Sequence, residues 1–235
     1  MSTISKVAQA LAFLTLVTAS AVGAPTIAQS ETVDFPLNGR VTVQAREEIG
    51  NFPRMVFISG RTHQPLLVSS ITDREKWLMP NAEDAVEFRP SLRFRIIRSQ
   101  GFASPLIMSV GLFTGGSDNA YFLTLFAEVG GKIVRLNSKP LFANVQGGFY
   151  FGYLNKRLGY GLAVWNFEWA TGAHYSEHKY AIDIYRISGG QLKRISHTLS
   201  KKAYDSDKGI DSLLELEIKG VDQRKGIPRI KDTLN

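Results

Sequence analysis

The stretch TGAHYSEHKY contains the pattern His-x-x-Glu-His, formed by His174, Glu177 and His178. On a helix, histidines at this spacing share one face and can bind a single zinc ion, as in metallopeptidases. Here a glycine precedes the pattern, and an alternating strand pattern begins at Tyr180. On an extended strand, residues four apart are separated by about 13 Å, which is too far for a shared ion. We therefore expect a connecting loop at this place rather than a peptidase centre.

The stretch DSDKGID is the best candidate for a cation site. Asp205, Asp207 and Asp211 alternate on a loop that contains glycine, and carboxylates are the hard oxygen ligands that calcium prefers. Lys208 lies inside the same loop and would repel a cation. The sequence leaves two alternatives open, a calcium site or a solvated turn, and it indicates no other cofactor.

Residues suited to binding gather at two further places. Arg93 and Arg95 are expected to project together from one face of a strand, because Leu92 and Phe94 alternate with them. The loop with the two histidines offers a second contact surface, made of Trp169, His174, Tyr175 and His178. With a net charge of +7, these surfaces favour anionic partners such as phospholipid headgroups, lipopolysaccharide or acidic glycans. The aromatic strands 148–154 and 161–169 either fill the core or form a stacking platform.

Most catalytic patterns are missing from the sequence. It has no nucleophile elbow, no phosphate-binding loop and no dinucleotide fingerprint, and His63 and His197 have no partner visible along the chain. A non-catalytic domain is therefore favoured. The alternative is a secreted hydrolase of sugars or esters, in which Glu168 and Glu177 would act as acid and base.

Residues 1–28 have the pattern of a secretory signal peptide. Lys6 is followed by an apolar stretch, and small residues precede a cleavage site after Ala28, with Ala24 as the other candidate. We expect export to the periplasm or the extracellular space, and no integral membrane protein after cleavage, since no other segment is long and apolar enough. The chain has no cysteine, so its fold cannot rely on disulfides. Nucleic acid is not expected as a partner of an exported chain.

The remaining sequence predicts an all-β domain over residues 29–218, followed by a basic, flexible tail at 219–235. Apolar runs separated by Gly, Pro, Asn and Asp indicate strands throughout, with one short helix at 72–79 and a strand or short helix at 213–220. Residues 121–136 match residues 180–195 without a gap, and in each a Gly-Gly pair predicts a tight hairpin turn. We expect at least two repeated hairpin units, at about 104–160 and 161–218.

Each such unit would resemble a blade of a β-propeller. Residues 153–167 and 205–216 are similar to blades of the FG-GAP/VCBS type, in which an acidic calcium-binding loop precedes an apolar strand. In this chain several ligand positions of that loop are replaced, by Tyr153, Arg157 and Lys208. The resemblance implies a small propeller-like array, while an antiparallel β-sandwich is the alternative. The function expected is an exported, non-catalytic domain that binds a protein, a polysaccharide or an anionic envelope surface.

Overall fold

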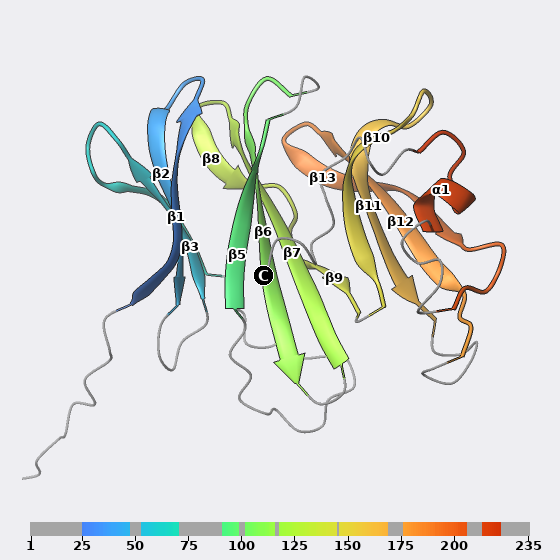
Figure 1. The fold of residues 1–235 in the computed structure, drawn as a ribbon. Helices are drawn as coiled ribbons and strands as arrows, with labels where there is room; N and C mark the ends of the chain where they lie inside the picture. Colours follow the sequence, from blue (N-terminus) through green and yellow to red (C-terminus); the bar gives the residue numbers. More distant parts are fainter. Residues whose placement is uncertain are drawn as a thin grey trace, which may run out of the picture.

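The chain forms three antiparallel sheets, which confirms the predicted all-β class (Figure 1). The computed structural model describes residues 25–47, 53–70, 91–98, 102–115, 118–144, 146–168, 176–205 and 213–221. The predicted helix at 72–79 and nearly all of the predicted tail lie outside these residues. Within them, no helix has the length and hydropathy needed to cross a membrane.

Each sheet is a meander in which consecutive strands pair as neighbours. Sheet A consists of β1 (Thr26–Phe35), β2 (Gly39–Glu47), β3 (Arg54–Ser59) and β4 (Pro65–Ser70). Sheet B consists of β5 (Ser91–Ile97), β6 (Leu106–Gly115), β7 (Asp118–Val129) and β8 (Lys132–Arg135), and β9 (Leu141–Ala143) also pairs with β7. Sheet C consists of β10 (Gly148–Asn155), β11 (Gly159–Phe167), β12 (Tyr180–Ser188) and β13 (Gln191–Leu199).

The repeated Gly-Gly hairpins are present in two of the sheets. Gly130 and Gly131 join β7 to β8, Gly189 and Gly190 join β12 to β13, and all four have positive φ angles. Other residues rarely adopt such angles, so the glycines fix the two-residue turns. Sheet A repeats the same arrangement, but its last hairpin turns through Gly60–Gln64, which is why the sequence did not reveal a third unit.

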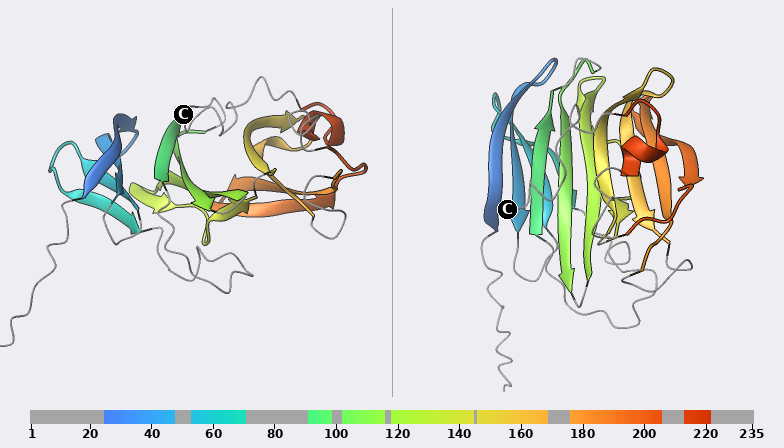
Figure 2. Two further views of the ribbon diagram at one scale, coloured as in Figure 1. Left: turned by 60° about the horizontal axis from the view of Figure 1, so that its bottom comes forward. Right: turned by 45° about the vertical axis from the view of Figure 1, so that its right-hand side comes forward.

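The sheets stack face to face in sequence order (Figure 2). One core lies between sheets A and B, and a second lies between sheets B and C. The third strand of each sheet places apolar side chains on the face that points towards the next sheet in the chain. Phe57 of β3 faces sheet B, and Leu123 of β7 faces sheet C. The equivalent face of sheet C, which includes Ile182, packs against Leu213 of the helix α1 (Leu213–Glu217). The helix therefore covers the face on which a further sheet would otherwise pack.

Polar side chains form hydrogen bonds between neighbouring sheets. The Glu128 carboxylate of β7 accepts hydrogen bonds from the backbone N–H groups of Leu37 (2.9 Å) and Asn38 (2.7 Å), in the β1–β2 turn. At the junction of sheets B and C, the Asn166 amide accepts from the Asn144 N–H at 2.7 Å and donates to the Phe142 carbonyl at 3.0 Å. The three sheets therefore form one connected body.

The boundary between the two expected units differs from the boundary between the sheets. The division between the predicted units 104–160 and 161–218 falls inside β11, whereas the chain passes from sheet B to sheet C between β9 and β10. The match between residues 121–136 and 180–195 marks two hairpins, and a hairpin pattern does not show with which strand its sheet begins. The strand β1 already begins at Thr26, so cleavage after Ala28 would remove its first three residues, whereas cleavage after Ala24 would leave it whole.

Candidate functional site

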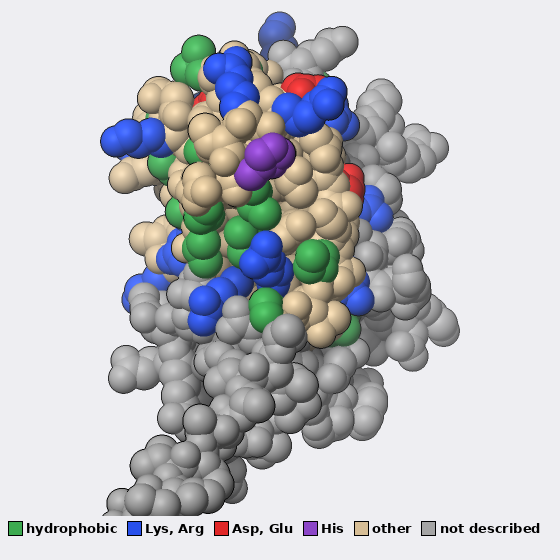
Figure 3. All heavy atoms as spheres, turned by 90° about the vertical axis from the view of Figure 1, so that its left-hand side faces the viewer, with side chains coloured by type: hydrophobic (Ala, Val, Ile, Leu, Met, Phe, Trp, Pro, Cys, Tyr) green, Lys and Arg blue, Asp and Glu red, His purple; other side chains and the backbone are tan. Residues whose placement is uncertain are grey.

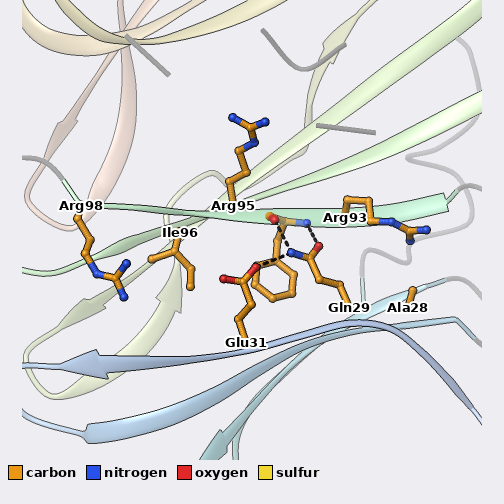
Figure 4. A pocket seen from close by; sticks show the side chains of 8 residues that line it. Ala28, Gln29, Glu31, Arg93, Arg95, Ile96 and Arg98 are labelled. Atoms are coloured by element: carbon orange, nitrogen blue, oxygen red, sulfur yellow. Dashed lines mark hydrogen bonds between the residues drawn. The ribbon is translucent and has the colours of Figure 1, made fainter. Parts of the chain in front are cut away.

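A groove of about 530 Å³ lies between β1 of sheet A and β5 of sheet B (Figure 4). It is lined from β1 by Ala28, Gln29 and Glu31, and from β5 and its end by Arg93, Phe94, Arg95, Ile96 and Arg98. Its size is within the range of small-ligand sites. Three of the lining residues are arginines and one is a carboxylate, so the groove is predominantly cationic.

The Gln29 side chain joins the two walls of the groove. Its Nε2 donates to the Phe94 carbonyl at 2.9 Å, and its Oε1 accepts from the Phe94 N–H at 2.8 Å. These are the two hydrogen bonds that a neighbouring strand would supply, so the side chain continues the pairing across the gap between the sheets. Nε2 also donates to Glu31 Oε1 at 2.7 Å, and this fixes the position of the carboxylate.

The arginines lie on both faces of β5. Leu92 and Phe94 are buried against sheet A, so Arg93 and Arg95 project from the opposite face, as the alternation predicted. The Arg93 guanidinium pairs with Glu47 at 3.4 Å. Arg98 follows the end of the strand and is exposed; its side chain points from β5 into the space between β5 and β1, which Glu31 enters from β1 (Figure 4). Sequence reasoning selected Arg93 and Arg95 but missed the β1 residues, because β1 itself was not predicted.

The loop with the two histidines was expected to offer a second contact surface, and the structure describes only His178 of the four residues named for it. Trp169, His174 and Tyr175 lie outside the described residues. His178 is completely buried, at 0% exposure, and its ring packs against that of Phe167 in a tilted arrangement, with 4.8 Å between centroids. Its backbone pairs in both directions with Tyr204, which draws the residue into the core of sheet C. His178 is therefore a core residue and does not present the surface expected of it.

Replacing His178 by leucine is expected to raise the free energy of unfolding by about 1–3 kcal/mol, because neither ring nitrogen has a hydrogen-bond partner in the described part of the chain. Urea denaturation would measure this change. The His178→Gln variant, which keeps buried polar atoms, should not be stabilised. A leucine variant less stable than the parent would show that the ring nitrogens of His178 do have hydrogen-bond partners.

The acidic loop is only partly described, since Asp207 and Asp211 lie outside the described residues. Asp205 follows Tyr204, whose hydroxyl donates to Glu217 of α1 at 2.5 Å. Burial, followed by this hydrogen bond, raises the pKa of Tyr204 to about 12, and burial together with the charge of Asp205 raises the pKa of Tyr180. Among the described side chains, no three His, Asp or Glu residues gather as a metal site would require. Calcium at Asp205, Asp207 and Asp211 stays a prediction.

The two glutamates of the hydrolase alternative lie near the ends of neighbouring strands. The Glu168 N–H donates to the Lys179 carbonyl at 2.8 Å, immediately beyond β11, and Glu177 is exposed two residues before Lys179. The aromatic face of β11, which precedes Glu168, is core: Trp165 and Phe167 are 5% and 3% exposed. A stacking platform on that face of β11 is therefore not available.

A polar cluster that the sequence did not reveal lies on sheet C. Asp183 Oδ1 is 2.8 Å from His197 Nδ1 and 3.2 Å from an Arg194 nitrogen, so His197 has a partner. Burial, with a contribution from Asp183, raises the pKa of the neighbouring Tyr185. The imidazole and the guanidinium are more than half exposed. Because Asp183 already compensates part of their charge, this cluster is a poorer anion site than the groove.

The outer face of sheet A is a second basic surface (Figure 3). Arg46 and Arg54 lie opposite each other on β2 and β3, and Leu66 and Val68 of β4 are 40% and 48% exposed. The Arg46 guanidinium bonds to Gln44 Oε1 at 2.9 and 2.7 Å. In Figure 3 the basic side chains are spread over the face and do not enclose a hollow. The groove between β1 and β5 therefore combines charge with shape more completely.

Comparison with known proteins adds no family: the chain matches no protein-family profile, no curated protein and no solved structure. The resemblance to FG-GAP/VCBS blades stays a prediction.

Proposed function

We propose that this chain is an exported, non-catalytic binding domain that holds an anionic ligand in the groove between β1 and β5. The observation that carries the proposal is the placement of Arg93, Arg95 and Arg98 around one groove that contains a single carboxylate. A guanidinium presents its N–H donors in a plane and can bind carboxylate, phosphate or sulfate through two hydrogen bonds. An acidic polysaccharide or an anionic envelope surface carries such groups.

The three arginines differ in how available they are to a ligand. Arg93 is held by Glu47, and its loss would leave that carboxylate without its partner. Arg98 is exposed and has no hydrogen-bond or ion-pair partner among the described residues. Arg95 belongs to the lining of the groove, but its side chain projects from β5 away from β1 (Figure 4). We therefore assign the larger part of the binding energy to Arg98.

The double variant Arg95→Gln/Arg98→Gln is expected to bind anionic ligands at least about tenfold more weakly, since a hydrogen bond to a charged group contributes about 1.5–3 kcal/mol. Suitable probes are polygalacturonate, dextran sulfate and phosphatidylglycerol in phosphatidylcholine vesicles, measured by titration at low and at physiological salt. Wild-type binding should weaken with salt, because the charges are exposed.

The matched control is Lys132→Gln/Lys193→Gln, which removes the same charge from exposed positions on β8 and β13. Circular dichroism would confirm that both double variants fold. Equal losses in the two double variants would show that net charge alone drives binding, and no binding of any probe by the wild-type chain would contradict the proposal.

A further inference from the structure

Glu31 is the one carboxylate among the described residues that line the groove, and a hydrogen bond holds it in place. Its Oε1 accepts a hydrogen bond of 2.7 Å from Gln29 Nε2. Gln29 is itself held by two hydrogen bonds to the backbone of Phe94. An exposed glutamate would ordinarily sample many rotamers, so this arrangement positions a negative charge inside an otherwise cationic groove.

Among the described residues, this carboxylate forms no ion pair with the arginines around it. In the described part of the chain, Arg93 pairs with Glu47, and the hydrogen-bond partner of Glu31 is the neutral amide of Gln29. Figure 4 shows Glu31 and Arg98 both projecting into the space between β1 and β5, with Ile96 between them. The groove therefore presents a cation and an anion that are separated by an apolar side chain.

From this arrangement we infer that the ligand is a zwitterion: an oxyanion and a primary amine joined by a short apolar link. This inference rests on the proposed anion binding and names the ligand class. The oxyanion contacts Arg98, the ammonium group contacts Glu31, and the link lies against Ile96. A ligand with negative charge alone would be repelled by Glu31, whereas an amine at that place turns the repulsion into attraction. Phosphoethanolamine, free or as a lipid headgroup, has this chemistry.

The test compares O-phosphoethanolamine with ethyl phosphate, which has the same phosphate ester but no amine. We expect the wild-type chain to bind phosphoethanolamine more tightly, by a factor of up to about five, the ratio for one exposed ion pair. In Glu31→Gln this preference should disappear, because the amide still accepts the Gln29 hydrogen bond but carries no charge. In Arg98→Gln both ligands should bind more weakly.

The outcomes separate this inference from the proposed function. If the wild-type chain binds both compounds equally, or if Glu31→Gln keeps the preference, the zwitterion is excluded while anion binding stands. If neither compound binds and Arg98→Gln changes nothing, the proposed function fails as well. Phosphatidylethanolamine and phosphatidylglycerol, each in phosphatidylcholine vesicles, then distinguish a lipid headgroup from a soluble ligand: tighter binding to the first than to free phosphoethanolamine indicates the lipid.

Discussion

Replacing Asn137 by alanine is expected to lower the free energy of unfolding by about 2–4 kcal/mol. Asn137 is 4% exposed and lies beside β7, in the gap between the end of β8 and the start of β9. Its Oδ1 accepts from the Leu125 N–H at 2.9 Å, and its Nδ2 donates to the Leu123 carbonyl at 3.1 Å. The side chain thus takes the place of a paired strand. Alanine would leave a buried N–H and a buried carbonyl without partners, and each such group costs about 1–3 kcal/mol.

Asn137→Asp should cost more than alanine, because a carboxylate oxygen would face the Leu123 and Lys139 carbonyls that the amide now donates to. Urea denaturation measures both effects. The matched control is Asn155→Ala in the β10–β11 turn, where the asparagine also makes three hydrogen bonds, but at a surface that water can reach. Similar losses at Asn137 and Asn155 would contradict the role given to Asn137.

The second large effect is expected from Phe57→Ala, which should lower the free energy of unfolding by about 3–5 kcal/mol. Phe57 is 0% exposed on β3 of sheet A, and its ring centroid lies 5.1 Å from that of Phe126 on β7 of sheet B. The substitution therefore removes packing that belongs to both sheets. Since sheets A and B share one core, the variant should still unfold in a single transition at a lower urea concentration.

Leu66→Ala is the control for this prediction. Leu66 belongs to the same sheet but is 40% exposed on β4, so its loss should change stability by about 0.5 kcal/mol or less. Fluorescence and circular dichroism recorded together would show whether the transition stays single. A separate early transition in Phe57→Ala would mean that sheet A folds independently of sheet B, against the shared core described above.

The hairpins were predictable from the sequence because their determinants are local. Two adjacent glycines permit the positive φ angles of the turn, and the alternating apolar residues fix which face is buried. The strand that carries Arg93 and Arg95, observed as β5, was predictable for the same reason. The paired projection of Arg93 and Arg95 follows directly from that alternation.

The Asp183–His197 pair shows why other contacts could not be predicted. The turn sets a register in which Tyr185 pairs with Arg194, and continuing it would place Asp183 opposite Ser196. A bulge between Ile184 and Tyr185 shifts the register by one residue and brings Asp183 opposite His197. A bulge inserts one extra residue into one strand of a pair, and the residue pattern of a single strand does not show where this happens.

The groove itself is a contact between segments far apart in the chain. Gln29 and Phe94 are separated by 65 positions, and nothing in either local sequence indicates that they meet.

The burial of His178 was not predicted for a similar reason: its polar neighbours along the chain suggested a solvated loop, whereas pairing with Tyr204 buries it. Local patterns predicted the strands, and the site depends on how the sheets stack.

The central claim is that an anion binds in the groove between β1 and β5, and an NMR titration tests it most directly. A short oligogalacturonate would be added to the isotopically labelled chain while backbone and arginine Nε–H signals are followed. We predict that the shifts concentrate at residues 28–31 and 93–98. Shifts confined to the outer face of sheet A or to the Asp183–His197 cluster, or no shifts at all, would contradict the claim.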